Sequence, residues 1–545
     1  MHAEATGSTI GIRWTGKIGA MGRSMIISSL CLCLLFSLML SVEAARLPKV
    51  PLSKLYNLSP GTSPHFPQGQ AERLIKSLGL LPGAADESYG AVNGPGLHER
   101  KVHLKVGDGS APAARAHDAE HYAGYFNSKR NRAANMFYVF FESRGDKAKD
   151  PLVLLMTGGP GCGSELAMFY QNGPFKIQDH IENLTLTWND FGWDKEASII
   201  YVDQPVGTGF SYNSNARDIR YDEEGVSEHM FDFFQEFFVA HPEFAKNDLF
   251  VMGESYGSHY VPAVSARLHQ ANKLRQGLPI NLKGFSIGNG LTHPNIRYEA
   301  YADYAWNMGL IADDDHKRLS KLFPACAKSI ELCETSGTVT CVAAYLVCQS
   351  IFNTVMAIAG NINSYDVRKE CNEDICYDFS NLETYLNTPQ VREELGVGDH
   401  KFLACSPLVY EAIFMEWMKS RKNRIPALLE DGIEVLVYAG DYDLVCNWLG
   451  NSRWATSLTW SGQEEYVRAP WRKFEVDGNE AGLVTGFKNL NFLKVQDAGH
   501  MVAMDQPRSS LEMFRRWTRG IPLGSSISPK KPDLKHMNPK TVFLS

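Results

Sequence analysis

Short apolar runs that end in turn residues recur along most of the chain and predict β-strands. The clearest of these runs lie at 135–143, 151–159, 197–203, 248–253, 282–288, 434–440 and 489–496. Between several of them the apolar residues follow a helical spacing instead, as in 223–240, where Val226, Met230 and Phe233 share one face. Strands that alternate with helices predict an α/β fold with a mostly parallel central sheet.

The alternation of strands and helices stops at residues 291–404, which are rich in cysteine and helix-like in their apolar spacing. We interpret them as a helical cap inserted between two parts of the core, 117–290 and 405–520. Residues 45–116 are rich in Pro, Gly and Ala and lack periodicity, so they are predicted to be a propeptide or linker. Residues 521–545 are predicted to form a C-terminal tail.

Residues 1–44 have the pattern of a secretory signal peptide. Basic residues precede an 18-residue apolar run at 25–42, and small residues stand at Val42 and Ala44. An uncleaved signal anchor is the alternative, because a run of this length could just span a bilayer. Cleavage near Ala44 predicts entry into the secretory pathway, no stable membrane span in the mature protein, and a secreted (extracellular) or vacuolar location.

Cysteine usage agrees with secretion. The chain has 11 cysteines, of which Cys31 and Cys33 lie in the predicted leader and six others fall between 326 and 376. An oxidising compartment would pair them, and the odd number left outside the leader predicts one free thiol. Asn57 and Asn183 stand in Asn-x-Ser/Thr sequences, which would permit glycosylation in that compartment.

The charge pattern narrows the range of partners. A net charge of −7 gives the chain no basic footprint, so nucleic acid is not an expected partner. The sequence lacks a His-Glu-x-x-His motif, so no metal is expected, and nothing in it predicts a cofactor. The oligomeric state is not indicated by any feature of the sequence.

The pattern Gly-x-Ser-x-Gly, which can form a strained turn that exposes a nucleophilic serine, occurs twice. The first match is GESYG at 253–257, where Ser255 follows a strand-like run and precedes a helical stripe. The second is GFSIG at 284–288, where Ser286 lies inside its own apolar run. The nucleophile is therefore predicted to be Ser255, and Ser286 is interpreted as a serine within a strand.

A serine nucleophile needs a base, and the base needs an acid that orients it. The run at 434–440 leads directly into Asp441 and Asp443, and the run at 489–496 is followed by His500. Serine, acid and histidine in this chain order are typical of an α/β hydrolase. The pattern alone leaves the choice between Asp441 and Asp443 open.

Five motifs in order carry a resemblance to a known family: TGGPGCGSELAMFYQNGPF, VDQPVGTGFSY, GESYGSHYVP, YAGDYDLVCNWLGN and AGHMVAMDQP. With them, about residues 117 to 520 resemble the serine carboxypeptidases, most closely the plant type III, which is similar to carboxypeptidase Y. The resemblance implies an α/β-hydrolase fold with an inserted Cys-rich helical cap. It also implies a catalytic triad of Ser255, Asp443 and His500.

The same resemblance implies roles for the residues around the triad. The oxyanion would be bound by backbone amides of Gly159 and Tyr256, and the small residues of GGPG would let that backbone approach a substrate. The free C-terminal carboxylate of a peptide would be bound by Thr157, Gly158, Gln171 and Glu254. The pocket of the leaving residue would be lined by Cys446 and Met501. A buried thiol that serves as a small apolar group is the alternative interpretation of Cys446.

The carboxylate-binding set contains a departure from the family pattern, which has Glu where this chain has Gln171. Two acids in contact share a proton, and a protonated Glu254 can then donate to the substrate. With Gln171 as its neighbour, the pKa of Glu254 must be raised by apolar burial and by the substrate carboxylate. We therefore expect activity at acidic pH with an altered pH dependence. Further departures stand at Leu155, Gly163, Gly257, Ser258 and Ala503, and Ser258 is expected to narrow the site.

The cysteine pattern of the family implies a particular pairing. The implied disulfides are Cys162–Cys405, Cys326–Cys348, Cys333–Cys341 and Cys371–Cys376. The same pattern leaves Cys446 free.

These observations predict a serine-type carboxypeptidase that releases C-terminal residues from peptides and proteins through an acyl-enzyme intermediate. An acyltransferase that moves an acyl group from a sugar ester to an alcohol is the alternative on the same scaffold. A binding or protective protein without activity is disfavoured, because Ser255, Asp443 and His500 are all present.

Overall fold

The computed structural model describes residues 96–104, 106, 120–128, 134–177, 184–213, 222–336, 338–371, 376–413 and 416–524. The predicted signal peptide, the two predicted glycosylation sites Asn57 and Asn183, and residues 525–545 of the predicted tail lie outside these residues. Most of the predicted propeptide or linker, 45–116, lies outside them as well. Within that range the structure has a strand, Gly96–Lys101, which pairs with the next strand of the sheet.

The sheet crosses the molecule in the order β1-β2-β3-β7-β4-β9-β10-β11-β14-β13-β12, and β8 pairs with β3. The six central strands, from β7 to β14, are mutually parallel, and antiparallel strands flank them on both sides. A separate hairpin pairs β5 with β6. The strands are β1 Gly96–Lys101, β2 His121–Asn127, β3 Ala134–Phe141, β4 Leu152–Met156, β5 Phe175–Ile177, β6 Leu186–Trp188, β7 Ser198–Val202, β8 Tyr212–Asn213, β9 Leu249–Glu254, β10 Leu282–Gly288, β11 Glu434–Gly440, β12 Arg472–Val476, β13 Asn479–Phe487 and β14 Leu490–Val495.

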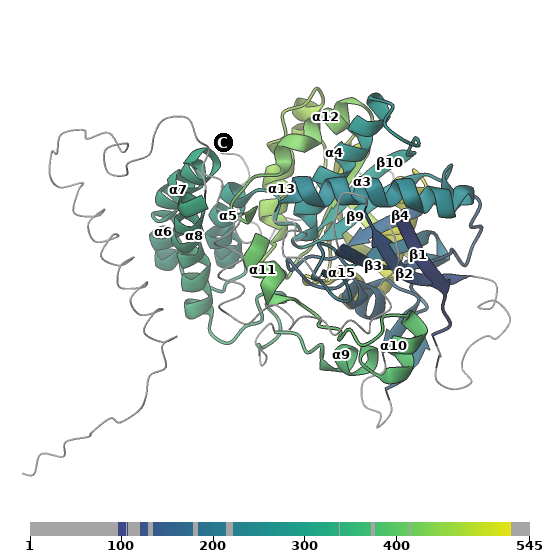
Figure 1. Ribbon diagram of the computed structural model, residues 1–545. Helices are drawn as coiled ribbons and strands as arrows, with labels where there is room; N and C mark the ends of the chain where they lie inside the picture. The colour runs from purple at the N-terminus through teal and green to yellow at the C-terminus, as the bar shows by residue number, and fades with distance from the viewer. Residues whose placement is uncertain are drawn as a thin grey trace, which may run out of the picture. The chain divides into compact units, whose positions relative to one another are not determined.

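Helices lie around this sheet (Figure 1). They are α3 Glu223–Ala240, α4 Gly257–Lys273, α5 Pro294–Asn307, α6 Asp313–Ser320, α7 Phe323–Ser336, α8 Thr338–Ala359, α9 Ser380–Leu386, α10 Pro389–Leu395, α11 Pro407–Ile413, α12 Ile425–Glu430, α13 Trp448–Thr456, α14 Gln463–Arg468, α15 Val502–Asp505 and α16 Pro507–Thr518. Short turns of other helix types are η2 Ala167–Gln171, η3 Trp193–Lys195, η5 Pro242–Phe244 and η7 Lys422–Arg424.

The sheet divides the core into two apolar layers, and β3 contributes side chains to both. Its side chains alternate, so Tyr138 and Phe140 pack with the phenylalanines of α3, while Phe137 and Phe141 face the opposite layer. In that second layer the ring of Trp193 stacks on Phe514 of α16 at 4.4 Å. The predicted fold class, an α/β-hydrolase fold with a mostly parallel central sheet, is confirmed.

Residues 291–404, where they are described, form the helices α5 to α10 and contribute no strand to the sheet. Helices α7 and α8 pack against each other and against α5. Within α8, Val339–Ala359 has a mean hydropathy of 1.7 and is the one described helical segment long and apolar enough to cross a membrane. Several of its side chains, including Cys341, Cys348 and Ile351, are instead buried against neighbouring elements.

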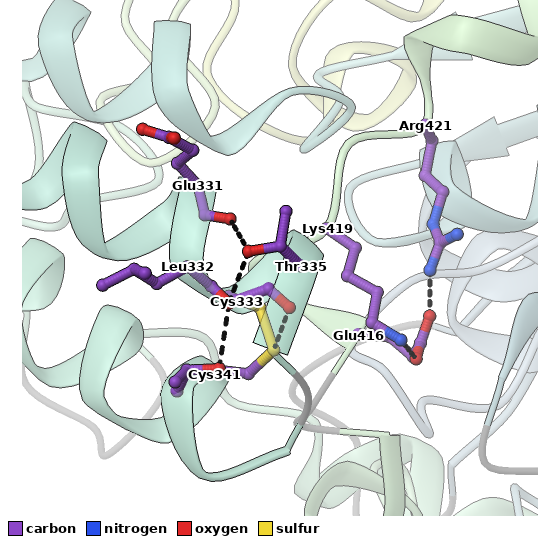
Figure 2. The surroundings of a disulfide bond; sticks show 9 residues. Glu331, Leu332, Cys333, Thr335, Cys341, Glu416, Lys419 and Arg421 are labelled. Carbon is purple, nitrogen blue, oxygen red and sulfur yellow. Dashed lines mark hydrogen bonds and ion pairs between the residues drawn. A yellow bond between two sulfur atoms is a disulfide. The ribbon is translucent and has the colours of Figure 1, made fainter. Parts of the chain in front are cut away.

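Two of the four disulfides, Cys326–Cys348 and Cys333–Cys341, join α7 to α8, and Figure 2 shows the second of them. The other two are Cys162–Cys405 and Cys371–Cys376, and Cys446 is free. These are the pairs that the family resemblance implies. The Cys162–Cys405 bond matters most for the site, because it ties the turn after β4 to the segment just before α11.

Removing the Cys162–Cys405 disulfide is expected to destabilise the fold more than removing Cys371–Cys376. The first bond closes a sequence separation of 243 residues and the second only 5. Because the loop entropy grows with the logarithm of loop length, paired alanine substitutions should lower the free energy of unfolding by about 3–5 kcal/mol in the first case and about 2 kcal/mol in the second. Urea denaturation of both variants measures the difference, and equal or reversed losses would contradict it.

Candidate active site

The predicted triad residues stand directly after three parallel strands of the sheet. Ser255 follows β9, Asp443 lies in the loop after β11, and His500 lies in the loop after β14. The strands β9, β10, β11 and β14 are consecutive neighbours. Since carboxyl ends of parallel strands meet at the same edge of a sheet, this order brings the three loops together.

Ser255 lies in a strained turn between β9 and α4. Its φ is 58°, a left-handed conformation that residues other than glycine rarely adopt. The turn is also tight, since a Cβ added to Gly257 would lie 2.5 Å from the carbonyl oxygen of Met156. The other candidate, Ser286, lies buried inside β10, as its apolar surroundings in the sequence indicate.

His500 and Asp443 form a buried pair. The Nδ1 atom of His500 lies 2.7 Å from Oδ2 of Asp443, and both side chains are buried. The alternative acid, Asp441, faces elsewhere, because its carboxylate lies 3.8 Å from Nζ of Lys494. The geometry therefore places Asp443 against the histidine.

Burial lowers the pKa of His500, but Asp443 and Cys446 raise it, and the net direction is upward.

Two other donors converge on Asp443. The side-chain amide of Asn289 donates to Oδ2 at 2.6 Å, and the backbone N–H of Cys446 donates to Oδ1 at 3.1 Å. Asn289 follows β10, the strand between those that carry Ser255 and Asp443.

The glycine-rich turn after β4 lies against the serine turn. A Cβ on Gly158 would come within 2.6 Å of the Tyr256 nitrogen and 2.7 Å of the Ser255 Cβ. Gly159 has a φ of 109°, so it too requires glycine. The backbone at Gly159 and Tyr256 is thus held close to Ser255, where amides could face a developing oxyanion.

A polar corner adjoins the serine on the side of β4. The side-chain amide of Gln171 donates to Oε1 of Glu254 at 2.9 Å. Burial raises the pKa of Glu254 to about 7, against the opposing effects of His500 and Gln171. The hydroxyl of Thr157 is buried and has no hydrogen-bond partner among the described residues. Thr157 and Gly158 follow β4 directly, Gln171 is the last residue of η2, and Glu254 is the last residue of β9.

Cys446 and Met501 are both buried beside the histidine and acid. The Cys446 sulfur, a ring nitrogen of His500 and a carboxylate oxygen of Asp443 all lie within 4.8 Å of one another, close enough for a metal ion. Burial raises the pKa of the Cys446 thiol to about 11. The thiol is therefore held protonated, which makes it a poor nucleophile.

The structure also places the further departures from the family pattern. Ser258 was expected to narrow the site, but it is fully buried and its Oγ accepts a hydrogen bond from the Leu291 backbone at 2.7 Å. Leu155 is buried in β4, and Ala503 lies in α15. A Cβ on Gly163 would contact Oε2 of Glu165 at 2.7 Å.

Sequence reasoning missed Asn289 and Tyr365. The centres of the Tyr365 and His500 rings lie 5.0 Å apart in an edge-to-face arrangement, and the Tyr365 carbonyl accepts a hydrogen bond from the His500 backbone N–H at 2.8 Å. Asn289 could have been found from its place directly after a strand-like run. Tyr365 lies in an irregular segment that carries no comparable signal.

A parallel sheet with a serine in a strained turn, followed in the chain by an acid and a histidine after later strands, defines an α/β hydrolase. The family model described as serine carboxypeptidase matches residues 112–520. The chain belongs to the serine carboxypeptidase family. This confirms the predicted family and enzyme class.

Similar proteins include serine carboxypeptidase-like 49 of Arabidopsis thaliana, which is 52% identical over 462 residues, covering 83% of this chain and 88% of that protein. Serine carboxypeptidase 3 of Hordeum vulgare is 53% identical over 467 residues, covering 84% of this chain and 90% of its own length. The crystal structure of a prohormone-processing carboxypeptidase from Saccharomyces cerevisiae has the same fold. It superposes with a TM-score of 0.65 at 24% identity and covers 81% of this chain and 95% of its own.

Asn289→Gly is expected to lower kcat about tenfold to a hundredfold, because Asp443 loses a hydrogen bond to a charged group. Glycine accommodates the φ of 40° at this position, so the backbone is not strained. Asn289→Asp should lower kcat further, since it adds a like charge beside Asp443. Steady-state kinetics on an ester substrate, with the urea midpoint as the control for folding, test this role, and an unchanged kcat in Asn289→Gly would refute it.

Proposed function

We propose that the protein removes C-terminal residues from peptides and proteins, with Ser255 as nucleophile, His500 as base and Asp443 as the acid that orients it. The observation that carries this proposal is the hydrogen-bonded pair Gln171–Glu254, which stands directly beside Ser255. A carboxyl group whose pKa is near 7 can be neutral next to a nucleophile and donate to an anion. A general esterase has no need of such a pair.

The proposed reaction begins with transfer of the Ser255 proton to Nε2 of His500, while Nδ1 donates to Asp443. The Oγ atom attacks the carbonyl carbon of the last peptide bond, and the backbone amides of Gly159 and Tyr256 bind the oxyanion. His500 then gives its proton to the leaving amine, and the C–N bond breaks. Water, activated by the same histidine, hydrolyses the acyl-enzyme and restores Ser255.

Recognition of the substrate carboxylate is proposed to use the polar corner. A protonated Glu254 donates one hydrogen bond, and the unpaired hydroxyl of Thr157 and the backbone of Gly158 supply others. Gln171 holds Glu254 in place through one of its two amide hydrogens and has the second available. Cys446 and Met501 are proposed to line the pocket of the residue that leaves.

The proposed substrates are thus peptide and protein C-termini. The proposed location is the secretory pathway, in a vacuole or outside the cell, and the disulfides support an oxidising compartment. The same acyl-enzyme could transfer its acyl group to an alcohol instead of water. The Gln171–Glu254 pair favours peptides, because an acyl donor without a carboxylate leaves it unused.

The peptidase reaction and the acyl transfer can be separated with three substrates. We expect the protein to release the C-terminal residue from a blocked dipeptide, to act poorly on the corresponding C-terminal amide, and not to transfer an acyl group from a sugar ester. Ser255→Ala should lower kcat by about 10⁶-fold. Chromatography of the products at pH ~5, where Glu254 is protonated, measures release. Cleavage that persists in Ser255→Ala would overturn the mechanism, and efficient transfer from the sugar ester would favour the alternative.

The pH dependence of KM tests the role of Glu254. Because the pKa of this group is raised to about 7, it is protonated at acidic pH, and KM for a blocked dipeptide should rise as the pH passes upward through about 7. Glu254→Gln should abolish this rise, since an amide is neutral throughout. Gln171→Glu should move it to higher pH, because a second carboxyl group disfavours ionisation of the first.

An amide or ester substrate, which has no free carboxylate, is the matched control and should show no rise in KM over the same pH range. A KM for the dipeptide that is constant from pH 5 to 8 in all three proteins would contradict the proposed carboxylate recognition. That outcome would not test Ser255 as the nucleophile, which the experiment with Ser255→Ala decides.

A further inference from the structure

Arg297 is a buried cation without a hydrogen-bond partner. Its side chain is 5% exposed, and none of its three guanidinium nitrogens has a partner among the described residues. Two other arginines with little exposure are paired: Arg421 binds Glu223 and Glu416, as Figure 2 shows in part, and Arg267 binds Glu228. Because burying an unpaired charge is unfavourable by several kcal/mol, the guanidinium favours binding of an anion, and no described residue supplies one.

The face of α5 that carries Arg297 is turned toward the proposed active site. Arg297, Tyr301 and Tyr304 are spaced by four and three residues and so share one face of the helix. The hydroxyl of Tyr301 donates to the Val445 carbonyl at 2.8 Å, and that of Tyr304 donates to the Asp441 carbonyl at 2.7 Å. These two bonds direct the face toward the loop that contains Asp443.

Aromatic rings connect Arg297 to the serine turn. Its guanidinium carbon lies 4.7 Å from the centre of the Tyr298 ring and 5.4 Å from that of Trp417. The Trp417 ring in turn stacks on Tyr256, the residue after Ser255, at 5.5 Å. Ring faces attract a cation, but they leave its N–H groups free to bind an anion.

The sheet order separates Arg297 from the corner that is proposed to bind the substrate carboxylate. Gln171 and Thr157 belong to the β4 side of β9, whereas α5 follows the loop after β10, on the other side of β9. A scissile bond placed at Ser255 therefore has the carboxylate of its C-terminal residue toward β4, and the side chain of that residue lies along Cys446 and Met501. The penultimate residue, which stays on the serine as the acyl group, then lies against the stacked rings of Tyr256 and Trp417, which lead to Arg297 on α5.

We propose that Arg297 determines specificity by binding the side-chain carboxylate of Asp or Glu at the penultimate position of the peptide. The guanidinium can make two parallel hydrogen bonds to a carboxylate, which a lysine or an amide cannot reproduce. This inference rests on the proposed function and deepens it, because it names the class of peptide that the enzyme prefers. The rings of Tyr298 and Trp417 exclude water from the pair and so strengthen it.

The test compares three blocked dipeptides that differ only at the penultimate residue, which is Glu, Gln or Leu. The measurements are made at pH ~6, where a glutamate side chain with a pKa of ~4.3 is ionised. The wild-type protein should show a kcat/KM for Glu at least about tenfold above that for isosteric Gln, as expected for a hydrogen bond to a charged group. Arg297→Gln should reduce this ratio to about 1 or below while it retains hydrolysis of the Leu peptide.

Stability supplies a second readout. Because Arg297 lacks a partner, Arg297→Met should leave the urea midpoint unchanged or raise it, whereas an arginine that holds the fold together would lower it. Arg421→Met, which leaves the buried Glu223 without its cation and Glu416 with Lys419 alone, is the matched control and should be strongly destabilised. A clear loss of stability in Arg297→Met, with the substrate preference unchanged, would assign the residue to the fold and overturn the proposal.

The outcomes separate this inference from the proposed function. If none of the three peptides is hydrolysed, the proposed function fails and the inference fails with it. If the Gln and Glu peptides are hydrolysed equally well, and Arg297→Gln changes neither, the inference alone fails. If the enzyme prefers an acidic residue only at the C-terminal position, Arg297 does not bind the penultimate side chain, and the proposal is overturned.

Discussion

The contact of the Gly158 backbone with the serine turn is the constraint on which the rest of the site depends. No side chain fits between the two, since even a Cβ would come within 2.7 Å of Ser255 and closer to the Tyr256 nitrogen. This contact sets the distance from the nucleophile to the backbone of Gly159. It also fixes where Thr157 and Gln171 stand relative to Glu254. The Cys162–Cys405 disulfide holds the far end of the same turn, so a covalent bond supports a geometry that packing alone would have to maintain.

The site contains two carboxyl groups with different environments, and the difference follows from their donors. Asp443 accepts hydrogen bonds from Asn289 and the Cys446 backbone and lies against His500. Glu254 is half-buried and has one neutral amide donor, and the effect of burial dominates and raises its pKa to about 7. One group can therefore orient a base while the other donates a proton in a hydrogen bond. Gln171 suits this division, because an amide cannot compete with Glu254 for the proton.

The sequence predicts those parts of the molecule that depend on local pattern. The strand-like runs, the choice of Ser255 over Ser286 and the position of His500 follow from periodicity and from residues that end strands. The same pattern narrows the acid to Asp441 or Asp443, and the choice of Asp443 came from the family resemblance. The family resemblance supplied the disulfide pairs and the backbone amides expected to bind the oxyanion, because the spacing of apolar residues carries no information about either. A strand at Gly96–Lys101 was not expected, because its residues read as a polar, glycine-flanked segment that becomes a strand only by pairing with β2.

Features that depend on the order of strands in the sheet were not predictable. Asn289 reaches Asp443 because β10 lies between β9 and β11, and the sequence does not state that order. Ser258 was assigned to the site from its place in the motif, yet the structure turns it toward Leu291. The lack of a partner for Arg297 depends on which acids lie near it in space, and charge along the sequence does not reveal this.

The loop from Asn289 to His293 links chemistry to substrate choice. Its middle is fixed to the first turn of α4, since the Leu291 N–H donates to Ser258 and the Leu291 carbonyl lies 2.9 Å from the His259 ring. Its beginning carries the amide that donates to Asp443, and its end starts the helix that carries Arg297. A shift of this loop would therefore move the acid of the proposed triad and the proposed specificity residue together. Ser258, a departure from the family pattern, holds the middle of this loop, and Arg297 lies on the helix that follows it, so substitutions at the two positions are expected to be coupled rather than additive.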